Sequence, residues 1–142
     1  MGKIIYSAVF AAMVLWGFQS FAALGEGAQP SPVSVDKSNP LFTIQTVDLQ
    51  GCTVREFVKP DGSVFGAAWE KCKTHPDLKL LLGKHYDGFA AAHEKHKNAH
   101  RHRMTHKKIE SKTAVVRMSG HMLSVSGTAV LKNAGDLASY VK

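Results

Sequence analysis

Residues 53–69 read TVREFVKPDGSVFGAAW, and this stretch decides the fold that the sequence predicts. Apolar and polar residues alternate from Thr53 to Val58, as they do in a strand with one buried face. Lys59 to Ser63 is a turn signal, because its proline presets φ and its glycine accepts the left-handed conformation. Val64 to Trp69 supplies the returning strand. The stretch therefore predicts a tight antiparallel hairpin.

One more strand is expected upstream of this hairpin. Phe42 to Leu49 alternates between apolar and polar residues and is rich in β-branched residues, and Gln50-Gly51 offers a turn. The three strands should form a meander. Its aromatic core is expected to be Phe57, Phe65 and Trp69.

The chain has two cysteines, Cys52 and Cys72, and both belong to this meander. Such a pair in an oxidising compartment favours a structural disulfide, which chain entropy predicts to stabilise the fold by about 3 kcal/mol. If the turn closes on Lys59 and Ser63, the cysteines miss direct opposition, so a diagonal pairing or a bulge at Gly66 is needed. Two buried free thiols or a redox pair are the alternatives, although the spacing is far from Cys-x-x-Cys.

A short helix and an unusual insert follow. Thr74 is the expected N-cap of the helix, Asp77 should support its N-terminal end, and Gly83 should end it. Residues 85–108 are rich in Ala, His, Lys and Arg and have few large apolar side chains. We expect this insert to be an exposed basic helix.

Thr113 to Leu131 returns to strand character, with a turn expected at Ser119-Gly120. On the second strand of this hairpin, Ser126 and Thr128 share a solvated face, and His121 is expected on the opposite, apolar face.

The order of these elements predicts the α+β class. We expect an antiparallel sheet of about five strands, made of the three-stranded meander and the C-terminal hairpin, with the helix on one face and the His-rich helical insert between the two parts.

The N-terminal residues 1–22 are typical of a secretory signal peptide, with Lys3, an apolar run, and small residues Ser20 and Ala22 before the cleavage point. A retained anchor is the alternative, but the run is shorter than the roughly 20 residues of a membrane helix. Residues 23–40 read as a flexible leader, 41–131 as a single domain and 132–142 as a tail. The mature chain is expected to be periplasmic or secreted.

Two groups of residues form a recognisable signature. The first is TVREFV at 53–58 followed by Asp61-Gly62, Phe65, Trp69, Pro76, Asp77 and Leu78, and the second is Gly120, His121 and Met122 followed by Gly127. Together they resemble the domain-of-unknown-function family numbered 2844, small exported proteins of Gram-negative bacteria. The resemblance covers about residues 41 to 131. It implies export and one small domain but no activity, and the family pattern neither requires the cysteines nor contains the His-rich insert.

The histidines suggest a metal site. In a helix His93, His96 and His100 lie at i, i+3 and i+7, so their imidazoles share one face and could hold Zn²⁺, Ni²⁺ or Cu²⁺. The many neighbouring cations oppose a dication. A solvated His-rich helix without metal is the alternative, and the cofactor stays open.

The same insert suggests binding to a polyanion such as lipopolysaccharide or anionic lipid on an envelope surface. The chain carries a formal net charge of +7, and no transmembrane span is expected in the mature part. No specific recognition of nucleic acid is predicted. The candidate contacts are Lys95, Lys97, Arg101, Arg103, Lys107 and Lys108.

Catalytic patterns are weak. The chain shows no Gly-rich phosphate loop, Gly-x-Ser-x-Gly elbow or His-Glu-x-x-His helix, and its carboxylates have no paired arrangement. His121 with Ser124 or Ser126 would make a base and a nucleophile only if they shared a sheet face. We therefore expect a non-enzymatic binding or envelope-associated module that uses residues 85–108 or the solvated sheet face.

Overall fold

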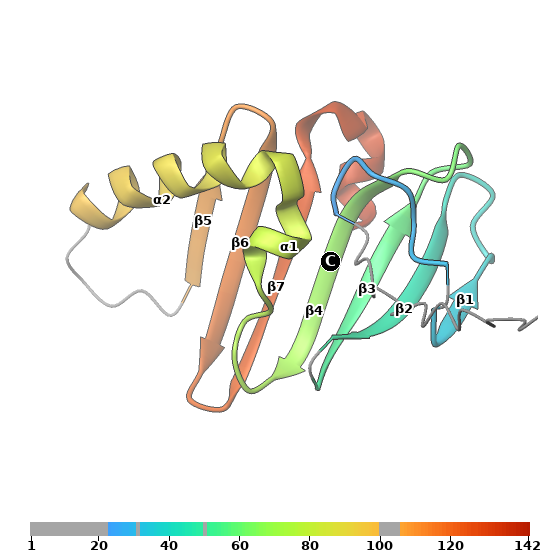
Figure 1. Ribbon diagram of the computed structural model, residues 1–142, viewed down its shortest axis with the longest axis horizontal. Coiled ribbons are helices and arrows are strands. Elements are labelled where there is room, and N and C mark those ends of the chain that lie inside the picture. The colour runs from blue at the N-terminus through green and yellow to red at the C-terminus, as the bar shows by residue number, and fades with distance from the viewer. Residues whose placement is uncertain (1–22, 31, 50, 100–105) are drawn as a thin grey trace, which may run out of the picture.

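The computed structural model describes residues 23–30, 32–49, 51–99 and 106–142. Its core is one antiparallel sheet in the order β1-β2-β3-β4-β7-β6-β5 (Figure 1). The strands are β1 (Ser34–Asp36), β2 (Thr43–Leu49), β3 (Cys52–Val58), β4 (Val64–Cys72), β5 (His106–Glu110), β6 (Ala114–His121) and β7 (Ser124–Leu131). The helical elements are α1 (Leu78–Leu82), η1 (Gly83–His85), α2 (Tyr86–Ala99) and η2 (Lys132–Tyr140).

The hairpin predicted from residues 53–69 is present. The amide of Lys59 donates to the carbonyl of Ser63 at 2.8 Å, and the amide of Gly62 donates back to Lys59 at 2.9 Å. The register then shifts between Phe57 and Val58, which marks a β-bulge beside Gly66. A bulge here was one of the two ways in which the sequence could bring the cysteines together, and a second irregularity follows between Trp69 and Cys72.

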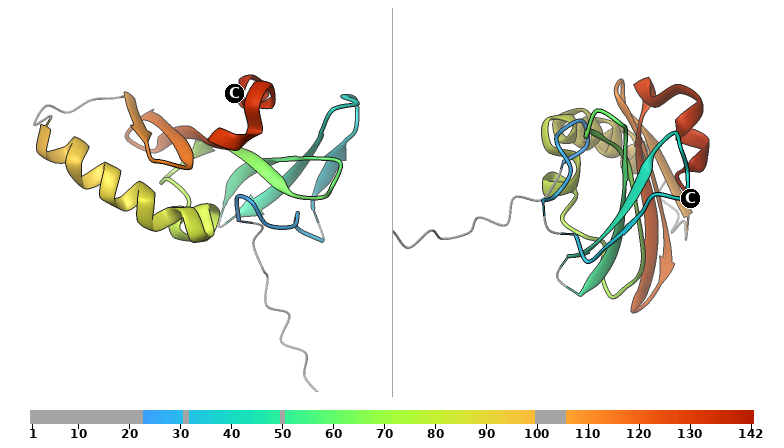
Figure 2. Two further views of the ribbon diagram at one scale, coloured as in Figure 1. Left: turned by 90° about the horizontal axis from the view of Figure 1, so that it is seen from above. Right: turned by 90° about the vertical axis from the view of Figure 1, so that its right-hand side faces the viewer.

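The two faces of the sheet are covered differently (Figure 2). On the helical face, α1, α2 and the segment around Leu24 bury a core that includes Trp69 and Phe89. The opposite face, which we call the open face, is covered at one end by η2. Three rings meet under η2: Phe42, Phe57 and Phe65 lie with centroids 5.8–6.0 Å apart.

The α+β class is correct, and α1 and α2 lie on one face, but η2 lies on the other face and the expected layout of five strands is wrong, because the described residues form seven. One added strand, β1, lies in the supposed flexible leader, where Ser34–Asp36 pairs with β2. Leu24, in the same leader, is completely buried, and the amide of Leu24 donates to the carbonyl of Leu81 at 2.9 Å. Composition missed both features: β1 is a three-residue strand without apolar alternation that depends on pairing with β2, and Leu24 is buried by a segment far away in sequence.

The other added strand, β5, lies in the supposed helical insert. Of the described part of the insert, residues up to Ala99 are helical and belong to η1 and α2. Lys107 and Lys108 belong instead to a strand that is paired with β6. Ile109 explains the change, because its side chain is 2% exposed and anchors the strand on the helical face.

Two local boundaries also differ from expectation. Asp77, and not Thr74, is the N-cap of α1: its Oδ1 accepts from the amide of Lys79 at 2.9 Å. The β6–β7 turn lies at Met122–Leu123 and not at Ser119-Gly120, so β6 continues through His121.

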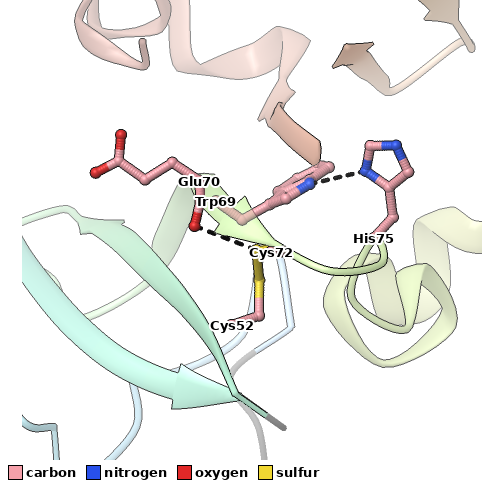
Figure 3. Close-up of a disulfide and its surroundings, with 5 residues drawn as sticks. All are labelled: Cys52, Trp69, Glu70, Cys72 and His75. Atoms are coloured by element: carbon pink, nitrogen blue, oxygen red, sulfur yellow. Dashed lines mark hydrogen bonds between the residues drawn. A yellow bond between two sulfur atoms is a disulfide. The ribbon is translucent and has the colours of Figure 1, made fainter. Parts of the chain in front are cut away.

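The disulfide Cys52–Cys72 is present and closes the end of the β3–β4 hairpin (Figure 3). The Sγ of Cys72 lies 3.3 Å from the main-chain oxygen of Glu70, a close contact only, because a bridged sulfur carries no proton. Both cysteines are buried in the helical-face core. The bridge therefore ties two core strands together.

Replacing both cysteines, Cys52→Ser with Cys72→Ser, should lower the free energy of unfolding by about 3 kcal/mol, because the unfolded chain regains loop entropy. Urea denaturation without reductant measures the difference, and adding reductant should bring wild type close to the variant. Equal midpoints without reductant would contradict a stabilising bridge.

Glu56 is the one buried carboxylate described, and it faces the leader segment. It lies directly opposite Gln45 on β2, and it accepts a hydrogen bond from the amide of Gln29. Three acceptor oxygens here, Glu56 Oε2, Gln45 Oε1 and Gln29 Oε1, are buried without a donor among the described residues. Burial therefore raises the pKa of Glu56 from its ordinary 4.5 to about 7.

The pKa of Glu56 is higher in the folded than in the unfolded chain, so its neutral carboxyl group favours folding. This contribution to the free energy of unfolding is complete below pH 4.5 and is lost as the pH rises through about 7. Glu56→Gln should remove this loss and stabilise the fold at alkaline pH by roughly 1–3 kcal/mol. Denaturation midpoints measured from acid to alkaline pH would test this. The idea fails if wild type and variant show the same pH dependence.

Candidate functional site

A row of cations crosses the open face of the sheet. Arg55 of β3 lies opposite Ala68 of β4, and Ala68 lies opposite Thr128 of β7. Arg117 of β6 lies between Thr128 and Lys108 of β5. Direct cross-strand partners share a face. Five neighbouring strands therefore place three cations on one line, with two small side chains between them.

A second row runs beside the first. Ser126 lies opposite Ser119, and their hydroxyls form a hydrogen bond of 3.1 Å. Toward the edge of the sheet, His106 of β5 lies opposite Ser119. Toward its centre, Glu70 of β4 lies between Trp69 and Cys72, where the pairing of β4 with β7 is irregular. The centre of the sheet thus carries only short side chains here, which leaves a depression between longer ones.

This depression is a cavity of about 560 Å³, and the C-terminal residues Val141 and Lys142 form its upper rim. We call it the basic trough. Its floor is Ala68, Ser119, Ser126 and Thr128, and the charged or titratable residues of its lining are Arg55, Glu70, His106, Lys107, Lys108, Arg117 and Lys142.

Arg55 is held in place by the end of the chain. Its Nη2 donates to the main-chain oxygen of Lys142 at 3.0 Å. Val141 is buried over Gly66, where a Cβ would approach its side chain to 2.5 Å, so the chain end packs closely on β4. The Nε of Arg55 is buried without a partner among the described residues. Because Nε is buried, a ligand in the trough would have to be bound by the Nη groups of this guanidinium.

The cations of the trough are incompletely neutralised. Glu110 lies 3.5 Å from Lys108 but only 2.8 Å from Lys132, and these contacts lower the pKa of its carboxyl, with the Lys132 hydrogen bond as the main cause. Within the described ranges no ion pair involves Arg117. Glu70 is the one carboxylate side chain of the lining. Like charges opposite one another destabilise a sheet, so the Arg117–Lys108 pair has a cost in stability.

The polyanion contacts expected from the sequence do not form one surface. Lys95 and Lys97 lie on α2, whereas Lys107 and Lys108 lie on β5. Both residues line the trough, but Lys107 is opposite Met118, so its side chain belongs to the helical face, and only the side chain of Lys108 lies on the open face. The expected contacts Arg101 and Arg103 lie outside the described residues.

Sequence reasoning missed Arg55 and Arg117 as site residues. Each occupies a polar position in an alternating strand, which by itself indicates only a solvated side chain. The one sequence feature that could have pointed to this site was the alternation that places Ser126 and Thr128 on a solvated face of the sheet.

The proposed metal ligands are only partly described. His93 stacks on Phe89 with ring centroids 5.7 Å apart, and burial, followed by the charge of Lys107, lowers its pKa. His96 lies one helical turn further, and His100 lies outside the described residues. No group of three metal-ligating side chains occurs in the described part of the chain, so the three-histidine site stays a prediction.

The signature residues have clear packing roles. Trp69 lies opposite Gly127, where a Cβ would come within 2.3 Å of the indole, so this position has to be glycine. The indole Nε1 donates to Nδ1 of His75 at 3.0 Å (Figure 3), and burial lowers the pKa of His75. Asp77 caps α1, as described above, between Pro76 and Leu78.

The remaining signature residues mark the β6–β7 end. A Cβ on Gly120 would lie 2.6 Å from Cα of Val125. His121 pairs with Ser124, so the two share the open face; the expectation of opposite faces was wrong because the turn lies further along. A shared face does not make them a base and a nucleophile here: the hydroxyl of Ser126 bonds that of Ser119, and among the described residues no hydrogen bond joins His121 to Ser124 or Ser126. Met122 is in the turn itself.

Comparison with known families gives one match: a family model described as "Protein of unknown function (DUF2844)" matches residues 19–134. No curated protein and no solved structure matches the chain. Across the described residues, no helix has both the length and the apolar character needed to cross a membrane.

Arg117→Gln should stabilise the isolated protein at low ionic strength by roughly 0.2–1 kcal/mol, because it removes the repulsion from Lys108. The gain should shrink in about 1 M salt, where exposed charges are screened. Urea denaturation at both salt levels measures it, with Lys37→Gln as a charge-matched control outside the trough. If Arg117→Gln is destabilising at low salt, the two cations do not repel one another as described.

Proposed function

This chain belongs to the DUF2844 family of proteins of unknown function, and from that premise we propose that it is a non-enzymatic binding module for an anionic ligand. The ligand binds in the basic trough. The observation that carries the proposal is the line of Arg55, Arg117 and Lys108 across a floor of small side chains, with Glu70 as the one carboxylate side chain of the lining.

The chemistry of the walls favours phosphate, sulfate or carboxylate groups. Guanidinium groups bind such oxyanions through paired hydrogen bonds, and an incompletely neutralised cluster gains most from them. Hydroxyls on the floor, from Ser119, Ser126 and Thr128, can donate further hydrogen bonds.

The spacing of the cations favours an extended ligand. Arg55 and Arg117 stand three strands apart, on β3 and β6, which corresponds to about 14 Å between their Cα atoms. One small anion would not engage both side chains equally well. We therefore expect a ligand with several anionic groups, such as lipopolysaccharide or an anionic lipid surface.

We place this activity outside the cytosol. The Cys52–Cys72 disulfide supports that location, because such bridges persist in oxidising compartments. The signal peptide expected at residues 1–22 agrees with it, although this segment lies outside the described residues. Export thus brings the trough to the anionic envelope surface on which we propose it acts.

Heparin serves as a probe of polyanion binding by the trough. The wild-type protein should bind it with an affinity that falls steeply as salt rises. The double variant Lys108→Gln with Arg117→Gln should bind about tenfold more weakly, and its log–log salt slope should decrease by about 1–2, because two contacts are lost. Titration calorimetry over a salt series provides the measurement.

The double variant Lys95→Gln with Lys97→Gln removes the same charge from α2 and is the matched control. It should retain most of the affinity. If the α2 variant loses binding while the trough variant does not, the ligand binds the helix and the trough proposal is wrong. Binding that is absent or insensitive to salt would exclude polyanion recognition altogether.

A further inference from the structure

The β6–β7 hairpin ends in two exposed apolar side chains. Met122 and Leu123 form its two-residue turn, between the paired residues His121 and Ser124. Their exposed fractions are 95% and 78%, the highest among the exposed large hydrophobic residues of the described chain. The hairpin projects at the lower edge of the sheet in Figure 1, at the end opposite η2. We call these two residues the apolar tip.

Folding alone does not account for the tip. Leu123 has φ 65°, in the left-handed region that favours glycine or asparagine and disfavours a branched side chain. Two-residue hairpin turns are most often Asn-Gly or Asp-Gly. This chain instead combines an unfavourable backbone conformation with exposed apolar surface, so both the conformation and the exposure have a cost.

Two lysines and two histidines surround the base of the tip. Cys72 pairs with Val125, which brings the exposed Lys71 and Lys73 of the neighbouring strand end close to the turn. His121 adjoins the tip directly, and His106 lies opposite Ser119, two residues before it on the same face. The carboxylates nearest along the sheet are Glu70 on β4 and, two strands further, Asp48 on β2. An apolar tip above a mainly basic collar matches an anionic lipid surface.

We propose that the apolar tip inserts into the interfacial layer of an anionic phospholipid bilayer, while the surrounding cations contact the headgroups. The anionic contact rests in part on the proposed function of the basic trough, which opens on the same part of the sheet. Insertion of the tip is a separate contribution. It buries Met122 and Leu123, which no contact within the described chain does.

Cosedimentation with phosphatidylcholine vesicles, with and without phosphatidylglycerol, tests the proposal on the purified protein. Wild type should bind the anionic vesicles and bind the neutral ones weakly. Met122→Asn with Leu123→Gly should lower binding to anionic vesicles by about tenfold or more, because two apolar side chains no longer leave water. The same variant should fold at least as stably as wild type, because residue 123 has φ 65°, a conformation that glycine adopts without strain.

Val33→Ser with Leu41→Ser is the matched control, because it removes two other exposed apolar side chains, 72% and 52% exposed, far from the tip in sequence and on the other half of the sheet. It should bind vesicles like wild type. Met122→Trp adds a direct readout: its emission should shift to shorter wavelength with anionic vesicles and stay unchanged with neutral ones.

The outcomes separate this inference from the trough. If the Met122→Asn/Leu123→Gly variant binds anionic vesicles like wild type, or the Met122→Trp emission does not shift, the tip does not insert and the proposal is overturned, even if heparin binding is normal. If the Lys108→Gln/Arg117→Gln variant keeps heparin binding while the tip variant loses vesicle binding, the trough proposal fails and the tip proposal stands.

Discussion

The pairing of β4 with β7 is the contact on which the rest of the structure depends. It joins a meander of four strands from the first half of the chain to three strands from the second half. The two halves are separated in sequence by α1, η1 and α2, so no short turn brings them together. The indole of Trp69 against Gly127 holds this junction, because any side chain at residue 127 would occupy the space of the ring. The family signature thus marks the place where the sheet is assembled.

The basic trough is a consequence of this junction. Where β4 meets β7 the open face carries Ala68, Ser126 and Thr128, whose short side chains leave space above the sheet. The cations on its two sides come from different halves: Arg55 belongs to the first meander, whereas Arg117 belongs to the C-terminal strands. Neither half alone contains the site.

Three local features are unfavourable for the stability of the fold, and they differ in what could compensate for them. The Arg117–Lys108 pair places like charges side by side, and the turn at Leu123 exposes apolar surface on a disfavoured backbone. Both features belong to the part of the sheet formed by β5, β6 and β7 and face solvent. A binding partner could therefore compensate for their cost in stability. Glu56 is different, because it is covered by the N-terminal segment and has no access to a ligand. The raised pKa of Glu56 instead makes the stability of the fold depend on pH.

The sequence by itself determined the β3–β4 hairpin, the Cys52–Cys72 bridge, the α+β class and the family resemblance, because each depends on alternation, turn residues or motifs close together in the chain. Only the tertiary structure decided that Ser34–Asp36 and His106–Glu110 are strands, since short segments at the edges of a sheet take that conformation from their partners. For the same reason the site residues were only partly foreseen. Lys108 was expected on a basic helix, and Arg55 and Arg117 were not singled out, because a cation on an alternating strand becomes part of a site only when distant strands align it with others.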